Sequence, residues 1–317
     1  MNFEIDEQQR DFAASIDAAL GAADLPAAVR AWATGDTGPG RKVWATLADL
    51  GVTALMVDED HDGIGAHPAD LAVACERLGY WCTPGPVSES VAAAPVLLTG
   101  DDRSAALASG ELIATVAAAP LQPRAVNADF AALILVASDG QVSDGTSGDR
   151  HESVDPSRQL FDVNASGSAR RVDVTRAVQL GVLATAAQLV GAGQALLDAS
   201  VDYAKQRTQF GRAIGSYQAI KHKLADVHIA LELARPLVYG AAVALGSDAA
   251  NAARDAHAAK AAASEAALLS ARSALQTHGA IGFTQEHDLG LLLLRVQALR
   301  SAWGDPATHR RHVLEAL

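Results

Sequence analysis

The C-terminal part of the chain, residues 175–317, constrains the fold most, because apolar residues recur there at helical spacing over very long stretches. The pattern predicts helices at about 174–205, 217–245, 247–277 and 284–303. Only short turns separate them, so neighbouring helices can run antiparallel. Alanine is abundant and aromatic residues make up only 4% of the chain, which favours close helix–helix packing. This part of the chain is therefore predicted to be a four-helix bundle.

The preceding residues divide into a helical part and a small β part. Helices are predicted from Phe12, Ile16 and Leu20 at helical spacing, and at 43–56, 68–78, 88–98 and 104–112, with Gly79 as the C-cap after 78. Short strands are predicted at 113–117 and 131–137, and turns at 138–140 and 143–149. The expected fold is mainly α with a small β segment. Its domains are an N-terminal helical domain (1–113), a reduced β domain (114–174) and a C-terminal four-helix bundle (175–317).

Charge and cysteine content exclude several function classes. A net charge of −12 argues against a nucleic-acid partner, because phosphate binding needs clustered Lys and Arg. The two cysteines, Cys75 and Cys82, are expected to be buried free thiols, and no residue cluster predicts a metal site. The acidic N-terminus lacks a signal-peptide pattern, and no apolar run reaches the roughly 20 residues of a membrane span. A soluble, cytoplasmic protein is expected.

The segment from Tyr203 to Asp226 concentrates the unusual features. A cationic helix end runs into a Phe-Gly turn, and a Gly-Ser break precedes the next helix at about Tyr217. Positive side chains beside a helix N-terminus can hold a phosphate or pyrophosphate. Charge pattern alone leaves open an ordinary helix–turn–helix with solvated Lys and Arg.

Three ordered motifs carry a family resemblance. The segment Arg207-x-Gln209-Phe210-Gly211-Arg212-x-Ile214-Gly215-x-x-Gln218 resembles the helix-turn segment of acyl-CoA dehydrogenases. Residues 276–284, read as Gln-Thr-His-Gly-Ala-Ile-Gly-Phe-Thr, resemble the family's Gln-x-x-Gly-Gly-x-Gly-Tyr-Thr motif. Residues 50–52 and 62–65 resemble its N-terminal loop, although Val57-Asp58 replaces the usual Pro-Glu. The resemblance covers both helical regions, about two-thirds of the chain.

The resemblance implies a role at an FAD shared between subunits, because in this family the flavin's pyrophosphate and adenosine reach a neighbouring subunit. It implies that Arg207 contacts the pyrophosphate, where a planar guanidinium suits two oxygens. Phe210 would pack near the cofactor and Gln218 would meet the adenosine. Gln276 and the turn of Gly279, Ala280 and Gly282 would bring the backbone close to the dinucleotide.

The catalytic base that the family uses has no counterpart at either of its usual positions. One position, about twenty residues after the glycine-rich turn, reads Trp303-Gly304-Asp305 here. The other lies upstream of Tyr203, where the chain reads Gln179-Leu-Gly181 and, further on, Gln188-Leu-Val-Gly191. Asp305 is the nearest substitute, although a Gly-Asp-Pro turn is also a common helix stop. Glu286 is expected to cap a helix or pair with His287.

The β segment also departs from the family. It lacks the Tyr-x-x-Thr-Glu-Pro strand and the Trp-Ile-Thr segment that hold the isoalloxazine, and it is too short for the full flavin-holding barrel. The chain thus looks like the short subunit of the α2β2 heterotetrameric acyl-CoA dehydrogenases of steroid-degrading actinobacteria. The resemblance implies a homologous full-length partner subunit paired through the bundle, an acyl-CoA substrate, and an electron-transfer flavoprotein or similar acceptor.

Two other interpretations stay open on the sequence. The chain could be a self-sufficient flavoenzyme that uses Asp305 or another acid, or a flavin-free scaffold or acyl-CoA-binding protein. The pair Gly191-x-Gly193 superficially matches a dinucleotide fingerprint, but no strand precedes it, so close helix packing is expected there.

Overall fold

The computed structural model describes residues 5–284 and 287–317. The N-terminal part is helical, and three of its helices begin at side-chain caps. Asp6 and Gln9 form a capping box at the start of the first helix, and Pro68 occupies the first turn of α4. The elements are α1 (Glu7–Gly21), α2 (Leu25–Ala33), α3 (Gly38–Asp49), the 3-10 turn η1 (Glu59–His61), α4 (Pro68–Tyr80), the π-helix η2 (Ser88–Ala93), α5 (Ala94–Leu97) and α6 (Arg103–Ala108).

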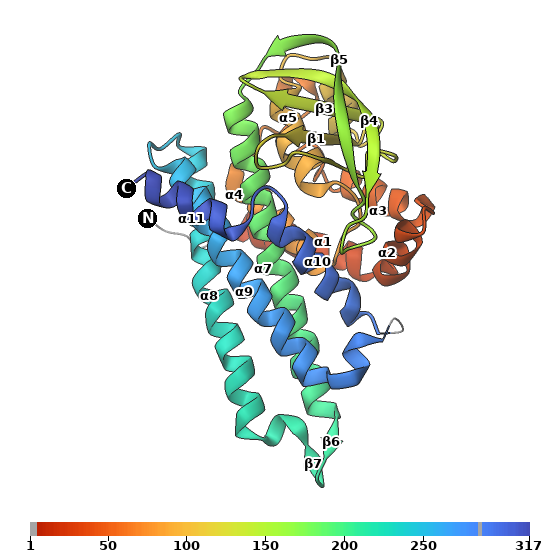
Figure 1. Ribbon diagram of the computed structural model, residues 1–317, viewed down its shortest axis with the longest axis vertical. Coiled ribbons are helices and arrows are strands. Elements are labelled where there is room, and N and C mark those ends of the chain that lie inside the picture. Colours follow the sequence, from red (N-terminus) through yellow and green to blue (C-terminus); the bar gives the residue numbers. More distant parts are fainter. Residues whose placement is uncertain (1–4, 285–286) are drawn as a thin grey trace.

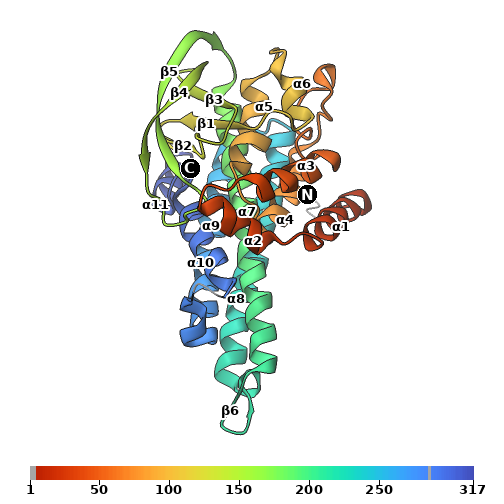
Figure 2. The ribbon, with the colours of Figure 1, turned by 90° about the vertical axis from the view of Figure 1, so that its right-hand side faces the viewer.

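A five-stranded sheet follows, in the order β1-β3-β4-β5-β2. Its strands are β1 (Ala114–Ala118), β2 (Ala125–Val126), β3 (Leu133–Ser138), β4 (Gln141–His151) and β5 (Leu160–Arg171). β1 pairs parallel with β3, and the other pairs are antiparallel. The sheet lies at one end of the molecule, above the long helices (Figures 1 and 2).

Three long helices and two shorter ones form the C-terminal part. They are α7 (Val174–Gln206), α8 (Gln218–Gly246), α9 (Ala252–His278), α10 (Leu289–Ser301) and α11 (Pro306–Glu315). The small hairpin of β6 (Thr208–Gln209) and β7 (Arg212–Ala213) and the turn η3 (Ile214–Ser216) join α7 to α8, and the turn η4 (Gly279–Phe283) follows α9. The hairpin lies at the end of the bundle away from the sheet (Figure 1). The mainly helical fold with a small sheet is confirmed.

Close backbone approach explains the small residues in α7, the central helix. A Cβ on Gly191 would lie 1.8 Å from the carbonyl oxygen of Glu76 in α4, and one on Gly193 would lie 2.7 Å from Leu231 in α8. The expectation of close packing at these two glycines is therefore confirmed. Gly79 is used in the same way against the backbone of Gln188, so its prediction as a C-cap is wrong, since α4 continues to Tyr80.

Several local predictions need correction. Residues 143–149 lie inside β4 and pair with β5, so the turn predicted there is wrong. Their glycines and polar residues are tolerated because most of this strand is exposed and its partner strand satisfies the backbone. The turn at 138–140 is confirmed, with Asp139 and Gly140 in the left-handed region. The helix at 25–33 was not predicted. The helix predicted at 43–56 ends at Asp49, and the helix predicted at 104–112 ends at Ala108.

Two helices, α7 and α8, are long and apolar enough to cross a membrane by length and composition alone, and the bent pair α1 and α2 would count as a third if taken as one span. The expectation that no apolar stretch reaches this length is therefore wrong. The apolar stretch of α7 is almost entirely buried, whereas more than half of that of α8 lies at the surface. Cys75 and Cys82 are free and buried, as expected.

Candidate functional site

Three of the predicted cofactor-binding residues lie at the tip of the bundle. Arg207 ends α7 in an extended conformation and its side chain is exposed. Its carbonyl accepts a hydrogen bond from Ile214 N at 2.8 Å, which closes the β6–β7 hairpin. Phe210 occupies the hairpin turn with φ of 53° and is 92% exposed. Gln218, also exposed, is the first residue of α8. The Phe210 ring is therefore accessible to another molecule.

The second predicted group, on the end of α9 and in η4, lies beside the first. The Tyr203 ring of α7 stacks on His278 of α9, with ring centroids 4.4 Å apart. Lys223 near the start of α8 donates a hydrogen bond to the side-chain oxygen of Gln276. Contacts from α7 and α8 thus hold the end of α9 against the hairpin end of the bundle. The structure therefore brings together two segments that are about 70 residues apart in the sequence.

The glycine-rich turn leaves its backbone open. Gly279 has φ of 64°, which favours glycine, and a Cβ there would meet no atom within 4 Å. Ala280 is exposed as well, whereas Gly282 is buried against His278, Leu289 and Leu275. An exposed guanidinium, an exposed aromatic ring and an open glycine backbone at one end of the bundle fit the phosphate and adenosine part of a dinucleotide.

Two of the segments in which a base was expected, 179–181 and 303–305, meet in a single packed contact. The Trp303 ring lies against Gly181 of α7, where a Cβ would fall 2.7 Å from the ring. Trp303 is fully buried, and its indole nitrogen donates to Glu89 Oε1 at 3.0 Å. The family resemblance predicts that neither segment supplies the usual glutamate. It did not identify their contact or Glu89, because residues 89, 181 and 303 come from three separate parts of the chain.

The backbone around Trp303 is also tied down. Its N–H donates to Gln122 Oε1 at 3.0 Å, and its carbonyl accepts from His309 Nε2 at 2.9 Å. The next carbonyl, of Gly304, accepts from the buried Lys260 at 3.1 Å. These bonds hold Trp303 at φ of 54°, a left-handed conformation that is unfavourable for a large side chain. The loop is therefore a fixed part of the core.

Asp305 occupies a helix-capping position. Its carboxylate accepts from Thr308 N at 2.7 Å and so caps α11. The hydrogen bond from the Thr308 backbone lowers the pKa of Asp305 below its ordinary value, and the side chain is exposed. Asp305 therefore acts as the helix cap of α11, and it lacks the burial and the raised pKa that a catalytic base would need. Glu286, the other acid considered, lies outside the described residues.

A buried ion pair fills the space between the sheet, the N-terminal helices and α10. Arg295 Nε donates to Asp155 Oδ2 at 2.6 Å, and its other nitrogens donate to the Thr83 carbonyl at 2.7 Å and to Ser157 Oγ at 3.0 Å. Burial is the largest single effect and acts to raise the pKa of Asp155, but the Arg295 charge and the hydrogen bonds from Ser157 and Arg295 together outweigh it and hold the pKa below its ordinary value. This ion pair therefore links all three parts of the chain.

The region around Trp303 is filled by protein side chains. The indole lies against Gly181 of α7, and its nitrogen donates to the buried Glu89, which lies 3.7 Å from the buried Arg158. The residues at the hairpin end fit the phosphate and adenosine part of FAD, whereas the space beside Gly181 is occupied by an indole.

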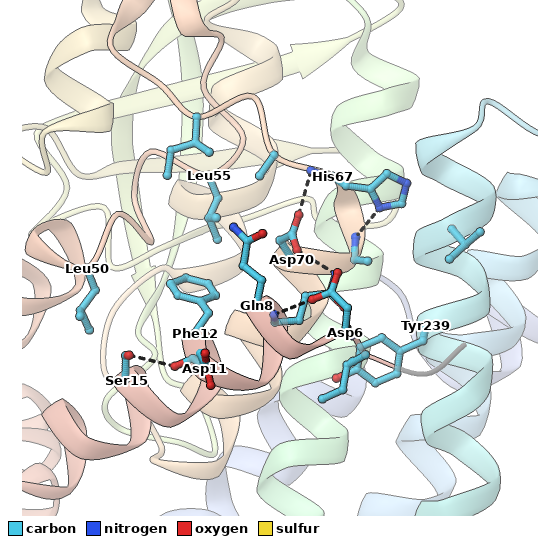
Figure 3. Close-up of a pocket in the computed structure, with 16 residues that line it drawn as sticks. Asp6, Gln8, Asp11, Phe12, Ser15, Leu50, Leu55, His67, Asp70 and Tyr239 are labelled. Atoms are coloured by element: carbon cyan, nitrogen blue, oxygen red, sulfur yellow. Dashed lines mark hydrogen bonds between the residues drawn. The ribbon is translucent and has the colours of Figure 1, made fainter. Parts of the chain in front are cut away.

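A pocket of about 760 Å³ lies elsewhere, between α1, the residues before α4, and α8 (Figure 3). Several of its polar groups already serve the fold. Asp70 accepts hydrogen bonds from His67 N at 3.1 Å and from Gln9 at 2.8 Å. Asp6 caps α1 and His67 caps α4. None of the predicted cofactor-binding residues lines this pocket.

Acid is expected to destabilise the Trp303 loop through its histidine pair. His309 Nδ1 lies 2.7 Å from His257 Nδ1, and burial lowers the pKa of His309 to about 3 and of His257 to about 4. An unfolded chain binds these protons near pH 6.5, so stability falls as the pH drops from there. Urea midpoints at pH 7.5, 6 and 5 should decrease steadily.

His309→Gln is the matched variant, because an amide can donate to the Trp303 carbonyl and accept from His257. It removes one titrating group, so its stability should depend less steeply on pH, by up to about 1.4 kcal/mol per pH unit. Equal slopes for the two proteins between pH 7.5 and 5 would contradict the assignment.

Comparison with known proteins assigns the fold to a family. The acyl-CoA dehydrogenase N-terminal domain matches residues 6–106 and the acyl-CoA dehydrogenase C-terminal domain matches residues 173–317. The chain is 33% identical to acyl-CoA dehydrogenase IpdE2 of Mycobacterium tuberculosis over 279 residues, which cover 85% of each protein. It is 32% identical to IpdE2 of Mycolicibacterium smegmatis, over 91% of this chain and 92% of the relative.

Solved structures agree at the level of the fold. The Tcur3481-Tcur3483 steroid ACAD G363A variant superposes with a TM-score of 0.87 at 21% identity, over 98% of this chain and 97% of that one. The ChsE4-ChsE5 complex from Mycobacterium tuberculosis gives 0.86 at 21% identity, over 99% and 98%. Both family domains match in order, and relatives above 30% identity align over most of the chain. The chain therefore belongs to the acyl-CoA dehydrogenase family.

Proposed function

We propose that this chain is the non-catalytic subunit of a flavin-dependent acyl-CoA dehydrogenase complex that dehydrogenates an acyl-CoA thioester between its α and β carbons. One observation carries the proposal. Trp303 packs on Gly181, between two segments in which the family resemblance expects a base, in a chain whose hairpin end still presents Arg207 and an open glycine turn. The substrate proposed is a steroid-degradation intermediate, supported by similarity to a structure described as a steroid ACAD.

In this proposal the residues at the hairpin end bind the part of FAD that projects from the partner subunit. Arg207 pairs with the pyrophosphate, Phe210 covers the cofactor and Gln218 faces the adenosine. Gln276 and the turn of Gly279, Ala280 and Gly282 let the dinucleotide approach the backbone. When bound, the flavin supplies the hydride acceptor, and this chain orients it while the partner provides the base and the acyl pocket.

The partner is proposed to be a homologous full-length subunit in an α2β2 assembly, which passes electrons to an electron-transfer flavoprotein or similar acceptor in the cytoplasm. An exposed apolar face of α8 supports a docked helix. Ile229, Leu233 and Leu237 stand one turn apart and are all large hydrophobic side chains at the surface. One similar structure is described as the complex of two proteins, ChsE4 and ChsE5.

The decisive test is the visible absorption spectrum of the full chain alone and after co-expression with a full-length acyl-CoA dehydrogenase encoded beside it. A colourless chain and a yellow complex with one FAD per pair of subunits are expected. Bleaching by an acyl-CoA should occur in the complex only. A yellow chain that bleaches alone would refute the proposal and return attention to Asp305. A stable complex without flavin would instead favour a scaffold.

The α8 face gives a separate prediction. Leu233, 69% exposed, lies in the middle of the apolar stripe, so Leu233→Asp would place a charge in the interface. We expect the partner to bind at least about tenfold more weakly in a co-purification titration. Leu314→Asp is the control, since Leu314 on α11 is 71% exposed and lies outside the stripe. Equal loss of binding in both variants would contradict the assigned face.

A further inference from the structure

A small pocket of about 330 Å³ lies between the loop after β1, the loop between β4 and β5, and the C-terminal end of α10. Its size is within the range of small-molecule sites. Val154 in its wall is 60% exposed, so the pocket opens to solvent on that side. Most of the wall is apolar, contributed by Leu121, Pro123, Val126, Val154, Leu160, Ala298 and Ala302.

Arg158 forms the polar part of this wall. The side chain is only 2% exposed, yet it donates no hydrogen bond to any residue in the described part of the chain. Its nearest anion is Glu89, whose Oε1 lies 3.7 Å from Arg158 Nη2, and that oxygen already accepts from Trp303. Buried guanidinium groups normally donate several hydrogen bonds, so Arg158, which lines this pocket, has donors that no described residue uses.

The neighbouring Arg295 shows the contrast. It is equally buried in the same region, but its three nitrogens donate to Asp155, to Ser157 and to the Thr83 carbonyl. The fold therefore supplies hydrogen-bond acceptors to the Arg295 guanidinium. It leaves the Arg158 guanidinium, which lines the pocket, without an acceptor among the described residues. The rim adds one charge of each sign, from Arg124 and Glu152.

We propose that this pocket binds a small organic carboxylate, with the carboxylate paired to Arg158 and its apolar body packed against the wall near Leu160 and Ala302. A planar guanidinium matches a carboxylate with two parallel N–H···O bonds, and desolvation in the pocket strengthens them. The apolar wall favours a ligand with a short hydrocarbon body over an inorganic anion. The site is separate from the flavin-binding end of the bundle and does not depend on it.

The test uses the full chain with hexanoate and hexan-1-ol as a matched pair of probes, which differ in the carboxylate. Isothermal titration or ligand-observed NMR should show hexanoate binding at least about tenfold more tightly than the alcohol. Arg158→Met should remove this preference. Since Arg158→Met also leaves Glu89 without its counter-ion, a second variant is needed that keeps the buried charges.

Ala302→Leu is that variant, because it fills the pocket from the end of α10 and leaves Arg158 in place. It should weaken hexanoate binding about tenfold or more at an unchanged melting temperature. Ala27→Leu, in a pocket of about 310 Å³ near α1, α2 and α3, is the matched control and should bind normally. Equal affinity for hexanoate and hexanol, or full hexanoate affinity in the Ala302→Leu variant, would overturn the proposal.

Discussion

An Arg207→Ala variant is expected to form the complex with its partner but to lose most of the bound flavin. A charge-assisted pair with phosphate oxygens contributes about 1.5–3 kcal/mol, so FAD affinity should fall roughly 10- to 100-fold. Arg207 is exposed at the end of α7, so its removal should not disturb the fold. The measurement is FAD content and flavin dissociation constant of the co-expressed complex, alongside its melting temperature.

Two further variants make this result specific. Lys205→Ala removes the same charge from the last turn of α7, where Lys205 is exposed and pairs with Asp202, and should leave the flavin content unchanged. Arg207→Lys keeps the charge but not the planar fork, and should give an intermediate affinity. If Arg207→Ala retains FAD as well as the unaltered complex, the proposed placement of the pyrophosphate is wrong.

Replacing Arg295 with Leu should produce the largest loss of stability, about 3–5 kcal/mol in the free energy of unfolding. The substitution leaves Asp155 charged and buried without its partner, and it frees the Thr83 carbonyl and Ser157 hydroxyl. Urea denaturation monitored by tryptophan fluorescence measures the change. The loss should become smaller at low pH, because without Arg295 the buried Asp155 becomes neutral more readily.

The double variant Arg295→Leu/Asp155→Asn separates the buried charge from the lost packing. Asparagine keeps an oxygen for Ser157 N but carries no charge, so the double variant should be more stable than Arg295→Leu alone. Arg310→Ala is the surface control. Arg310 forms an ion pair with Glu265 at 3.1 Å in which both side chains are exposed, so the substitution should lower the free energy of unfolding by less than about 1 kcal/mol. If the stability losses of the two single substitutions simply add in the double variant, the unpaired charge of Asp155 is not the cause of the Arg295→Leu loss.

The spacing of apolar residues in the sequence was sufficient to predict the long helices of this protein. α7, α8 and α9 end within a few residues of where the apolar periodicity of the sequence ends, since such long helices are specified by many side chains at once. Short elements were predicted less well. Residues 143–149 have the composition of a turn but form part of β4, because pairing with β5 satisfies their backbone groups and residues 146–149 are exposed.

For the site, the sequence predicted the residues at the hairpin end and the absence of the usual glutamate from both segments where the family resemblance expects a base. Only the tertiary structure decided what surrounds those segments. Trp303 and Gly181 are more than a hundred residues apart, and their fit depends on how α10 and its following loop pack against α7. The lack of hydrogen-bond acceptors around Arg158 likewise depends on the tertiary structure, which places this side chain beside Glu89 and in the wall of the pocket. Composition and periodicity act over neighbouring residues, whereas burial and hydrogen-bond partners depend on the whole packed chain.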